Sequence, residues 1–172
     1  LVLKQVADII WVKRDLRIQD HSCLYEASKS TNKVIWMYCF EPSFLQRNDS
    51  SDRHLQFVYG SILDIKKRIS DPNNLHVFHA DFLDVLRDLN SKFTINRLLS
   101  YQESGPLETW ERDKKVKEFC NTNNIQWVEF QQNGIQRGIS NRKGWDQSWY
   151  KTMFSPVQKI DLGRINFIRE KI

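Results

Sequence analysis

The sequence predicts an α/β fold: a doubly wound, five-stranded parallel sheet, Rossmann-like in class, with helices on both faces. Strand-like apolar runs alternate with helix-like spacings along the 172 residues, and this alternation implies right-handed crossovers between parallel strands. The runs at residues 9–12 and 95–99 are rich in isoleucine and leucine, which suits strands that are covered on both faces. We therefore expect the first and fourth strands to be neighbours near the centre of the sheet.

Local patterns mark where each element begins and ends. The second apolar run, KVIWMYCF, is rich in strand formers and stops at Glu41-Pro42. Ser51 or Asp52 is placed to cap the second helix, and Asp81 to cap the third. In chain order we expect a strand at 8–13, a helix at 21–29, a strand at 33–40, a helix from 52 that ends before Pro72, a strand at 75–78, a helix from 82, a strand at 95–101, a helix at 107–121 and a strand at 125–130.

The same patterns predict the core. Apolar residues three and four apart on a helix share one face, which we expect to pack on the sheet. Trp11, Trp36 and Trp127 lie within predicted strands and are expected in the core. The helix residues expected to face inward are Leu55, Val58, Ile62, Ile65 and Ile69, then Phe82, Val85, Leu86 and Leu89, then Trp110, Val116, Phe119 and Cys120.

Composition argues against several classes of protein. No window approaches the ~20 apolar residues of a membrane span, and no signal peptide is recognisable, so we expect a soluble, cytoplasmic protein. Cys23, Cys39 and Cys120 lack C-x-x-C spacing, which argues against a disulfide framework or a zinc site. The net charge of +5 is concentrated after residue 136; it would attract phosphate, but an ordinary surface is the favoured interpretation.

Motifs for catalysis, metal binding and phosphate binding are missing from the sequence. Neither G-x-G-x-x-G nor G-x-x-x-x-G-K-[ST] occurs. His76 and His79 fall on and just after a predicted strand, where this spacing points side chains to opposite faces, so a shared metal is not expected. Ser22 and Ser61 have no acid or base partner nearby in sequence. We therefore expect neither catalytic residues nor metal ligands in this chain.

The two ends of the chain suggest a fragment of a longer protein. The first residue is Leu1 rather than methionine, and the chain stops at Ile172 within a charged run, residues 163–172, with helical character. Before that run, the glycine-rich segment after residue 130 predicts an irregular excursion with a short amphipathic helix.

The segment Trp11-Val-Lys-Arg-Asp-Leu-Arg-Ile-Gln-Asp20 carries the most specific pattern in the chain. Its charges begin at Lys13, at the carboxyl end of the first strand, where ligands bind in open α/β sheets. From the charges alone, the simpler interpretation is that its arginines and aspartates bridge one another to fix the loop. The segment nevertheless closely resembles the W-x-R-R-D-L-R-x-x-D signature of the DNA photolyase and cryptochrome family, which often has arginine at the position of Lys13.

Two further segments resemble the same family, in the same order along the chain. Residues 130–137 are similar to the phrase F-x-Q-N-G-V-x-R, and R-x-G-W and a second tryptophan follow at Arg142, Trp145 and Trp149. Residues 108–113 are similar to the family's E-x-x-x-R-D segment after the fourth strand. Together the three matches cover nearly the whole chain and are more specific than any one of them.

The resemblance implies the first domain of a two-domain flavoprotein. In that family a larger helical domain binds FAD, receives the flipped-out lesion and repairs pyrimidine dimers by light-driven electron transfer. Residues 1–132 would form the α/β antenna domain, residues 133–172 an irregular excursion and the start of the interdomain linker, and the FAD-binding helical domain would be absent. The full-length parent would be a deoxyribodipyrimidine photolyase, a lyase, or a signalling cryptochrome, and the isolated chain would not be catalytic. DNA would be bound through the full-length protein, and the exposed linker region would promote self-association.

The resemblance also implies an antenna site, in which a folate, a deazaflavin or FMN collects light and passes the excitation to FAD. Such a site needs a cleft at the strand ends, a flat apolar wall and a few polar groups. For Glu108, near the start of its helix, a role in completing the helix dipole is at least as well supported. The expected cofactor-binding residues are Arg14 and Asp15 after the first strand, Cys39, Phe40 and Glu41 after the second, and Gln102, Glu103 and Glu108 after the fourth.

Two other functions remain open at this point. One is an adenine-nucleotide-binding module of the universal-stress or α-hydrolase type, whose phosphate loop needs glycines after the fourth strand, where only Gly105 is present. The other is a non-catalytic interaction domain without a chromophore.

Overall fold

The computed structural model describes residues 3–47 and 50–172 and contains the expected alternation of strands and helices. The nine strands and helices predicted between residues 8 and 130 are all present, within a few residues of their expected bounds. One further turn of helix, α2, follows β2 and was not expected. In chain order the elements are β1 (Val6–Val12), α1 (Ser22–Ala27), β2 (Lys33–Cys39), α2 (Pro42–Leu45), α3 (Asp52–Arg68), the 3₁₀ turn η1 (Pro72–Asn74), β3 (Leu75–Phe78), α4 (Phe82–Lys92), β4 (Thr94–Tyr101), α5 (Leu107–Thr122), β5 (Gln126–Phe130), α6 (Trp145–Met153) and the 3₁₀ turn η2 (Leu162–Arg164).

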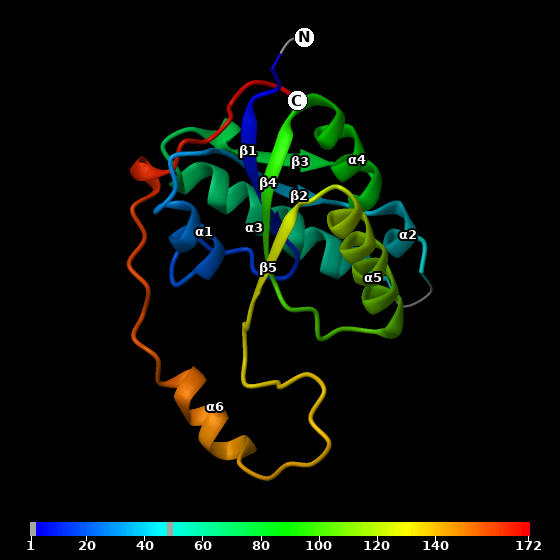
Figure 1. The fold of residues 1–172 in the computed structure, drawn as a ribbon, viewed down its shortest axis with the longest axis vertical. Coiled ribbons are helices and arrows are strands. Elements are labelled where there is room, and N and C mark those ends of the chain that lie inside the picture. Colours follow the sequence, from blue (N-terminus) through cyan, green and yellow to red (C-terminus); the bar gives the residue numbers. More distant parts are fainter. Residues whose placement is uncertain (1–2, 48–49) are drawn as a thin grey trace.

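The sheet is entirely parallel, with strand order β3-β2-β1-β4-β5 (Figure 1). In β1, Ile9 aligns with Ile35 of β2 on one side and with Leu98 of β4 on the other. The expected class is confirmed, and so is the prediction that the first and fourth strands pair at the centre. Because the chain moves from β1 to β2 on one side and later from β3 to β4 on the other, a switch point lies between β1 and β4.

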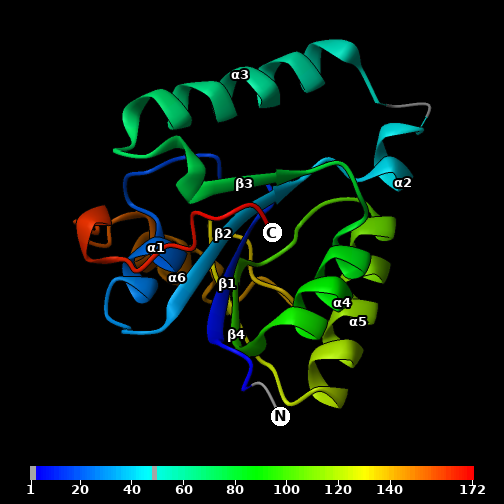
Figure 2. The same ribbon diagram turned by 90° about the horizontal axis from the view of Figure 1, so that it is seen from above.

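Helices cover both faces of this sheet (Figure 2). Alternate residues of β1 divide between the two cores: Ile9 and Trp11 pack against α4 and α5, whereas Ile10 and Val12 pack against α1 and α3. The buried apolar residues on α4 and α5 are Phe82, Val85, Leu86, Leu89, Val116 and Cys120, and those on α1 and α3 are Cys23, Leu24, Ala27, Ile62 and Ile65.

The predicted burial of the strand tryptophans is confirmed for Trp11 of β1 and Trp36 of β2, and Trp127 of β5 is partly buried. Trp11 and Trp36 are each 1% exposed. Trp127 is half-buried against the α4–α5 side and donates its indole N–H to Ser100 Oγ at 3.0 Å. By contrast, Trp110 lies outside both cores, and its indole N–H donates to the Gly105 carbonyl at 3.0 Å.

The N-terminal half of α3 differs from its prediction. Ile62 and Ile65 are buried as expected, but Leu55 and Val58 are only partly covered because an open cavity, described below, separates this half of the helix from the sheet. Ser51 occupies the N-cap position, yet its side chain makes no capping hydrogen bond.

Asp81 also fails to cap its helix with its side chain, although it occupies the N-cap position of α4. Its carboxylate instead accepts hydrogen bonds from the amide and the hydroxyl of Ser43, at 3.1 and 2.9 Å. These donors belong to the unexpected helix α2, so Asp81 fixes α2 beside the end of β3.

The segment after β5 leaves the sheet and carries α6 away from the body of the domain (Figure 1). Within it, the Trp149 ring packs directly over Gly134, where any Cβ would overlap the indole. Tyr150, Met153, Phe154 and Val157 are more than half exposed, so the excursion presents an apolar surface to solvent.

The last residues return to the sheet rather than forming the helix expected for residues 163–172. Val34 of β2 donates its amide to the Asn166 carbonyl and accepts from the Ile168 amide, both at 2.9 Å. Ile165, Phe167 and Ile168 are buried. Strand pairing and burial outweigh the helical character of this run.

Among the described helices, none combines the length with the apolar character that crossing a membrane requires.

Candidate functional site

A cavity of about 610 Å³ opens at the carboxyl ends of β1, β2 and β4. This size falls within the usual range for sites that bind small molecules or cofactors. One wall comes from the strand ends and the loops that follow them, a second from α2 and the N-terminal half of α3, and a third from the start of α5. It lies beside the switch point of the sheet, where this fold class places its ligands.

The walls of the cavity are largely aromatic and aliphatic. The Tyr38 and Phe40 rings pack edge to face with their centroids 5.0 Å apart. Burial and the nearby Glu41 charge raise the pKa of the Tyr38 phenol to about 12. The apolar lining also includes Leu16, Phe44, Leu45, Leu55, Phe57 and Val58.

Arg112 of α5 organises the polar floor of the cavity. Its guanidinium donates to Glu41 Oε1 at 2.7 Å, to Glu103 Oε2 at 3.2 Å and to Asp113 Oδ1 at 2.9 and 3.0 Å. Its Cζ also lies 4.6 Å from the centroid of the Trp11 ring. One buried cation thus ties the ends of β2 and β4 to α5 and β1.

Lys13 is the second buried cation of this floor. Its Nζ donates to Asp113 Oδ2 at 2.7 Å, and its side chain is only 5% exposed. The same Nζ lies 4.3 Å from the ring centroid of Trp11 and 5.4 Å from that of Trp127. Burial lowers the pKa of Lys13, although the Asp113 charge and hydrogen bond oppose that shift.

The two glutamates of the floor are extensively bonded within the protein. Glu41 Oε2 accepts from the Phe82 amide at 3.2 Å, and burial raises the pKa of Glu41 against the opposing effect of Arg112. Glu103 Oε1 accepts from the Ser104 and Gly105 amides at 3.0 and 2.8 Å. These bonds fix both carboxylates in place at the strand ends.

Arg14 is the exposed charge at the mouth of the cavity. Its side chain is 58% exposed, and its Nε lies 3.6 Å from Glu103 Oε1. A Cβ at Gly105 would overlap the Arg14 guanidinium and crowd Glu103 Oε1, so the glycine allows both groups to occupy these positions. Arg14 is therefore held across the mouth, where it can meet an anionic group of a ligand.

The structure brings together five of the eight residues predicted to bind a cofactor. The five that line the cavity are Arg14, Cys39, Phe40, Glu41 and Glu103. Burial raises the pKa of the Cys39 thiol, which keeps this group protonated and suits an apolar wall residue rather than a nucleophile.

The other three predicted residues lie outside the lining. Asp15 is buried behind it, with its Oδ2 2.8 Å from His21 Nε2. The Gln102 backbone amide donates to the Phe130 carbonyl at 2.8 Å, which continues the β4–β5 pairing. Glu108 is 58% exposed and pairs with Arg47 at 3.3 Å, in the first turn of α5.

Sequence reasoning missed Arg112, Asp113 and the contribution of α3. Arg112 and Asp113 form the R-D pair of the segment at residues 108–113. The motif therefore marks these two residues, but by itself it indicates the family resemblance and not a place in the cavity. The α3 residues Leu55 and Phe57 could not be distinguished by pattern, because an apolar cavity wall and an apolar core require the same spacing.

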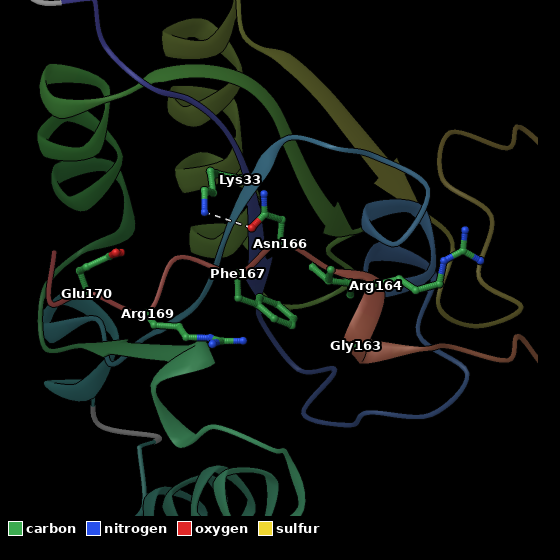
Figure 3. A pocket seen from close by; sticks show the side chains of 8 residues that line it. Lys33, Gly163, Arg164, Asn166, Phe167, Arg169 and Glu170 are labelled. Atoms are coloured by element: carbon green, nitrogen blue, oxygen red, sulfur yellow. Dashed lines mark hydrogen bonds between the residues drawn. The ribbon is translucent and has the colours of Figure 1, made fainter.

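A second hollow, of about 460 Å³, lies at the opposite end of β2, between Lys33 and the returning residues 163–170 (Figure 3). Its charged groups do not converge. Lys33 Nζ donates to Asn166 Oδ1 at 3.1 Å, and Arg169 donates to Asn74 Oδ1 at 3.2 Å. Figure 3 shows Arg164 pointing away from Lys33 and Arg169. This hollow lacks the focused charge of an anion site.

Comparisons with known proteins place the chain in a family. The sequence pattern of the family described as "DNA photolyase" matches residues 8–159. Cryptochrome-1 of Anopheles gambiae is 29% identical over 134 residues, which are 72% of this chain and 24% of that protein. A 31.6 kDa protein from the atpI 5′ region of Synechococcus sp. is 32% identical over 140 residues, which are 81% of this chain and 44% of that protein.

The fold also matches solved structures. An archaeal photolyase from Sulfolobus tokodaii, whose crystal structure contains two FAD molecules and is described as implying a novel light-harvesting cofactor, superposes with a TM-score of 0.73 at 19% identity. The match covers 94% of this chain and 38% of that one. This chain therefore spans less than half the length of each of these three proteins.

Proposed function

Because this chain belongs to the DNA photolyase family, we propose that it acts as the family's α/β antenna domain and that the cavity at the carboxyl ends of β1, β2 and β4 binds a flat, light-harvesting chromophore. The family match covers residues 8–159, and the parallel α/β fold is that of the family's solved structures. The nucleotide-hydrolase alternative is not favoured, since that match accounts for nearly the whole chain.

The observation that carries the proposal is the composition of the cavity. A fused ring system needs flat apolar walls, which Phe40, Phe44 and Phe57 supply. It also needs a space of several hundred Å³, which the cavity provides. Arg14 would meet an anionic tail at the mouth, and Arg112 would keep the floor rigid. When bound, a folate, deazaflavin or FMN would supply absorption of blue or near-ultraviolet light.

The proposal extends to a longer parent. The relatives are longer than this chain, and we place in the remainder of such a parent a helical domain that carries the redox-active FAD, contacts DNA and, in a repair enzyme, splits pyrimidine dimers. Residues 1–132 and 133–172 would then be antenna domain and linker region, in a cytoplasmic protein. Residues 1–2 and 48–49 lie outside the described part of the chain.

Self-association of the isolated chain is a further part of the proposal. Tyr150, Met153, Phe154 and Val157 present an apolar surface on and after α6, and exposed patches of this kind favour association. Light scattering of the wild-type chain and of a Phe154→Ser variant would measure it.

A titration tests the antenna proposal. The purified chain is mixed separately with FMN, a deazaflavin, a folate and ATP; binding of the three chromophores is followed by their fluorescence anisotropy, and binding of ATP by isothermal titration calorimetry. We expect one of the three chromophores to bind at the cavity and ATP not to bind. Phe44→Ala should weaken that binding, whereas Phe154→Ala, a matched substitution on the exposed excursion, should not. Binding of ATP alone, or equal effects of the two substitutions, would contradict the proposal.

A further inference from the structure

Trp11 is the one tryptophan among the described residues that line the cavity, and its surroundings bear on what happens after light is absorbed. An excited flavin, deazaflavin or pterin next to an indole or phenol is ordinarily quenched, because one electron passes from the side chain to the excited ring. That step forms an indole radical cation and a chromophore radical anion, with the chromophore as the oxidant. A light-harvesting chromophore loses its excitation in this way before the energy can be passed on.

Two buried cations lie against the ring that would have to become positive. Lys13 Nζ is 4.3 Å and Arg112 Cζ 4.6 Å from the centroid of Trp11, both within the range of a cation–π contact. A cation near a ring disfavours a second positive charge on that ring, and the effect is large where water is excluded. Three carboxylates balance these charges: Asp113 is hydrogen-bonded to both cations, and Glu41 and Glu103 accept from Arg112. The two cations contact the face of the Trp11 ring directly.

Lys13 also disfavours the transfer of positive charge from Trp11 to a second indole. Trp127 is the neighbouring indole, with its centroid 6.2 Å from that of Trp11. Lys13 Nζ lies 5.4 Å from the Trp127 ring, so a positive charge that reached Trp127 would also meet this cation. The other face of Trp11 is stacked on Phe82 at 3.6 Å between centroids, and phenylalanine is a poor electron donor.

The remaining rings of the lining fit the same pattern. Phe40, Phe44 and Phe57 are hard to oxidise. Tyr38 is the one phenol among the described lining residues, and oxidation of a phenol requires that its proton be lost. Burial raises the pKa of Tyr38 to about 12, which disfavours the readily oxidised phenolate form.

We infer that Lys13 and Arg112 suppress electron donation from Trp11, so that a chromophore in the cavity stays fluorescent and can transfer its excitation. This inference rests on the proposed function, because it needs a chromophore in the cavity. In this inference the charge network has a photochemical role in addition to holding the loops together. Lys13 and Arg112 act through their effect on Trp11 rather than as direct ligands of the chromophore.

The test measures the fluorescence lifetime of FMN bound to four forms of the chain, with a deazaflavin as the second probe. Wild type and Trp11→Phe should give similar lifetimes, because Trp11 is already silent. Lys13→Met should shorten the lifetime severalfold, and Lys13→Met with Trp11→Phe should restore it. Lys29→Met is the matched control, since Lys29 Nζ lies 4.2 Å from the Tyr25 ring, away from the cavity.

The outcomes separate this inference from the proposed function. If the probe binds and Trp11→Phe alone lengthens its lifetime severalfold, Trp11 is an active quencher and the inference is wrong. The same conclusion follows if Lys13→Met leaves the lifetime unchanged. If neither probe binds to any form, the antenna proposal itself fails and the inference fails with it. A longer lifetime in Trp11→Phe would overturn the inference without any change at Lys13, so the inference stays falsifiable even if the lysine variant is unstable.

Discussion

Lys13 Nζ and Asp113 Oδ2 lie 2.7 Å apart and join the carboxyl end of the central strand to a helix 100 residues further along the chain. Both side chains are nearly inaccessible to water, so the contact is a buried ion pair. Lys13→Met should lower the free energy of unfolding by about 2–3 kcal/mol, because a charged hydrogen bond is lost while Arg112 still compensates Asp113. Adding Asp113→Asn should recover part of that loss, as measured by urea unfolding; additive losses would show that the two residues act independently.

The pair between Asp15 and His21 should make stability depend on acidity. Burial alone would raise the pKa of Asp15, but the hydrogen bond and charge of His21 and the Lys13 amide hold it below the ordinary value of 3.8. The folded state therefore favours the carboxylate, and the resulting stability is full above pH 3.8 and is lost as the pH falls through the lowered pKa. The difference in unfolding free energy between wild type and Asp15→Asn should shrink as the pH is lowered below 4. Asp84→Asn, in an exposed pair with Arg87, is the control.

Two glutamates that are near each other in sequence should respond differently to the same substitution. Glu103→Gln removes a buried charge that accepts from Arg112 and two backbone amides, and should cost about 1–3 kcal/mol of stability as well as chromophore affinity. Glu108→Gln breaks only an exposed pair with Arg47 and should change stability by less than about 1 kcal/mol. Thermal unfolding and the chromophore titration measure both effects; equal results for the two variants would mean that burial does not distinguish them.

Two glycines offer an opposite pair of predictions. Gly60 lies within α3, and an added Cβ would meet nothing within 4 Å, so Gly60→Ala should stabilise the fold by about 0.5–1 kcal/mol through helix propensity. Gly134→Ala should displace the Trp149 ring and loosen the excursion. The first change should appear in urea unfolding and the second as a changed tryptophan emission. An unchanged emission spectrum for Gly134→Ala would contradict the close packing of Trp149.

The sequence was sufficient for the sheet because its signals are local. Isoleucine-rich runs such as residues 9–12 suit a strand covered on both faces, and the intervening helical spacings favour parallel crossovers. The end of the chain shows the limit of local signals. Residues 163–172 read as helical, but Val34 of β2 offers an unpaired amide and carbonyl, and only the assembled sheet reveals that Asn166 and Ile168 pair with them.

The candidate site was partly predictable for a related reason. Residues at strand ends, such as Phe40 and Glu103, could be assigned to one edge of a parallel sheet from topology alone. Arg112 could not, since its contact with Glu41 crosses 71 residues and depends on the angle at which α5 docks. The same holds for Leu55, whose apolar character indicated burial but not the cavity that it faces.

The excursion after Phe130 is anchored at both ends, since β5 pairs with β4 and residues 165–168 pair with β2. It is therefore a closed loop in the polymer sense, and its main thermodynamic cost is the entropy of holding its ends in place. That cost grows only with the logarithm of length, at about 0.6 kcal/mol for each doubling. Changes in the length or side chains of α6 and its flanking segments should therefore have little effect on the stability of the sheet. This part of the chain is free to diverge in evolution, while the cavity at the strand ends stays constrained.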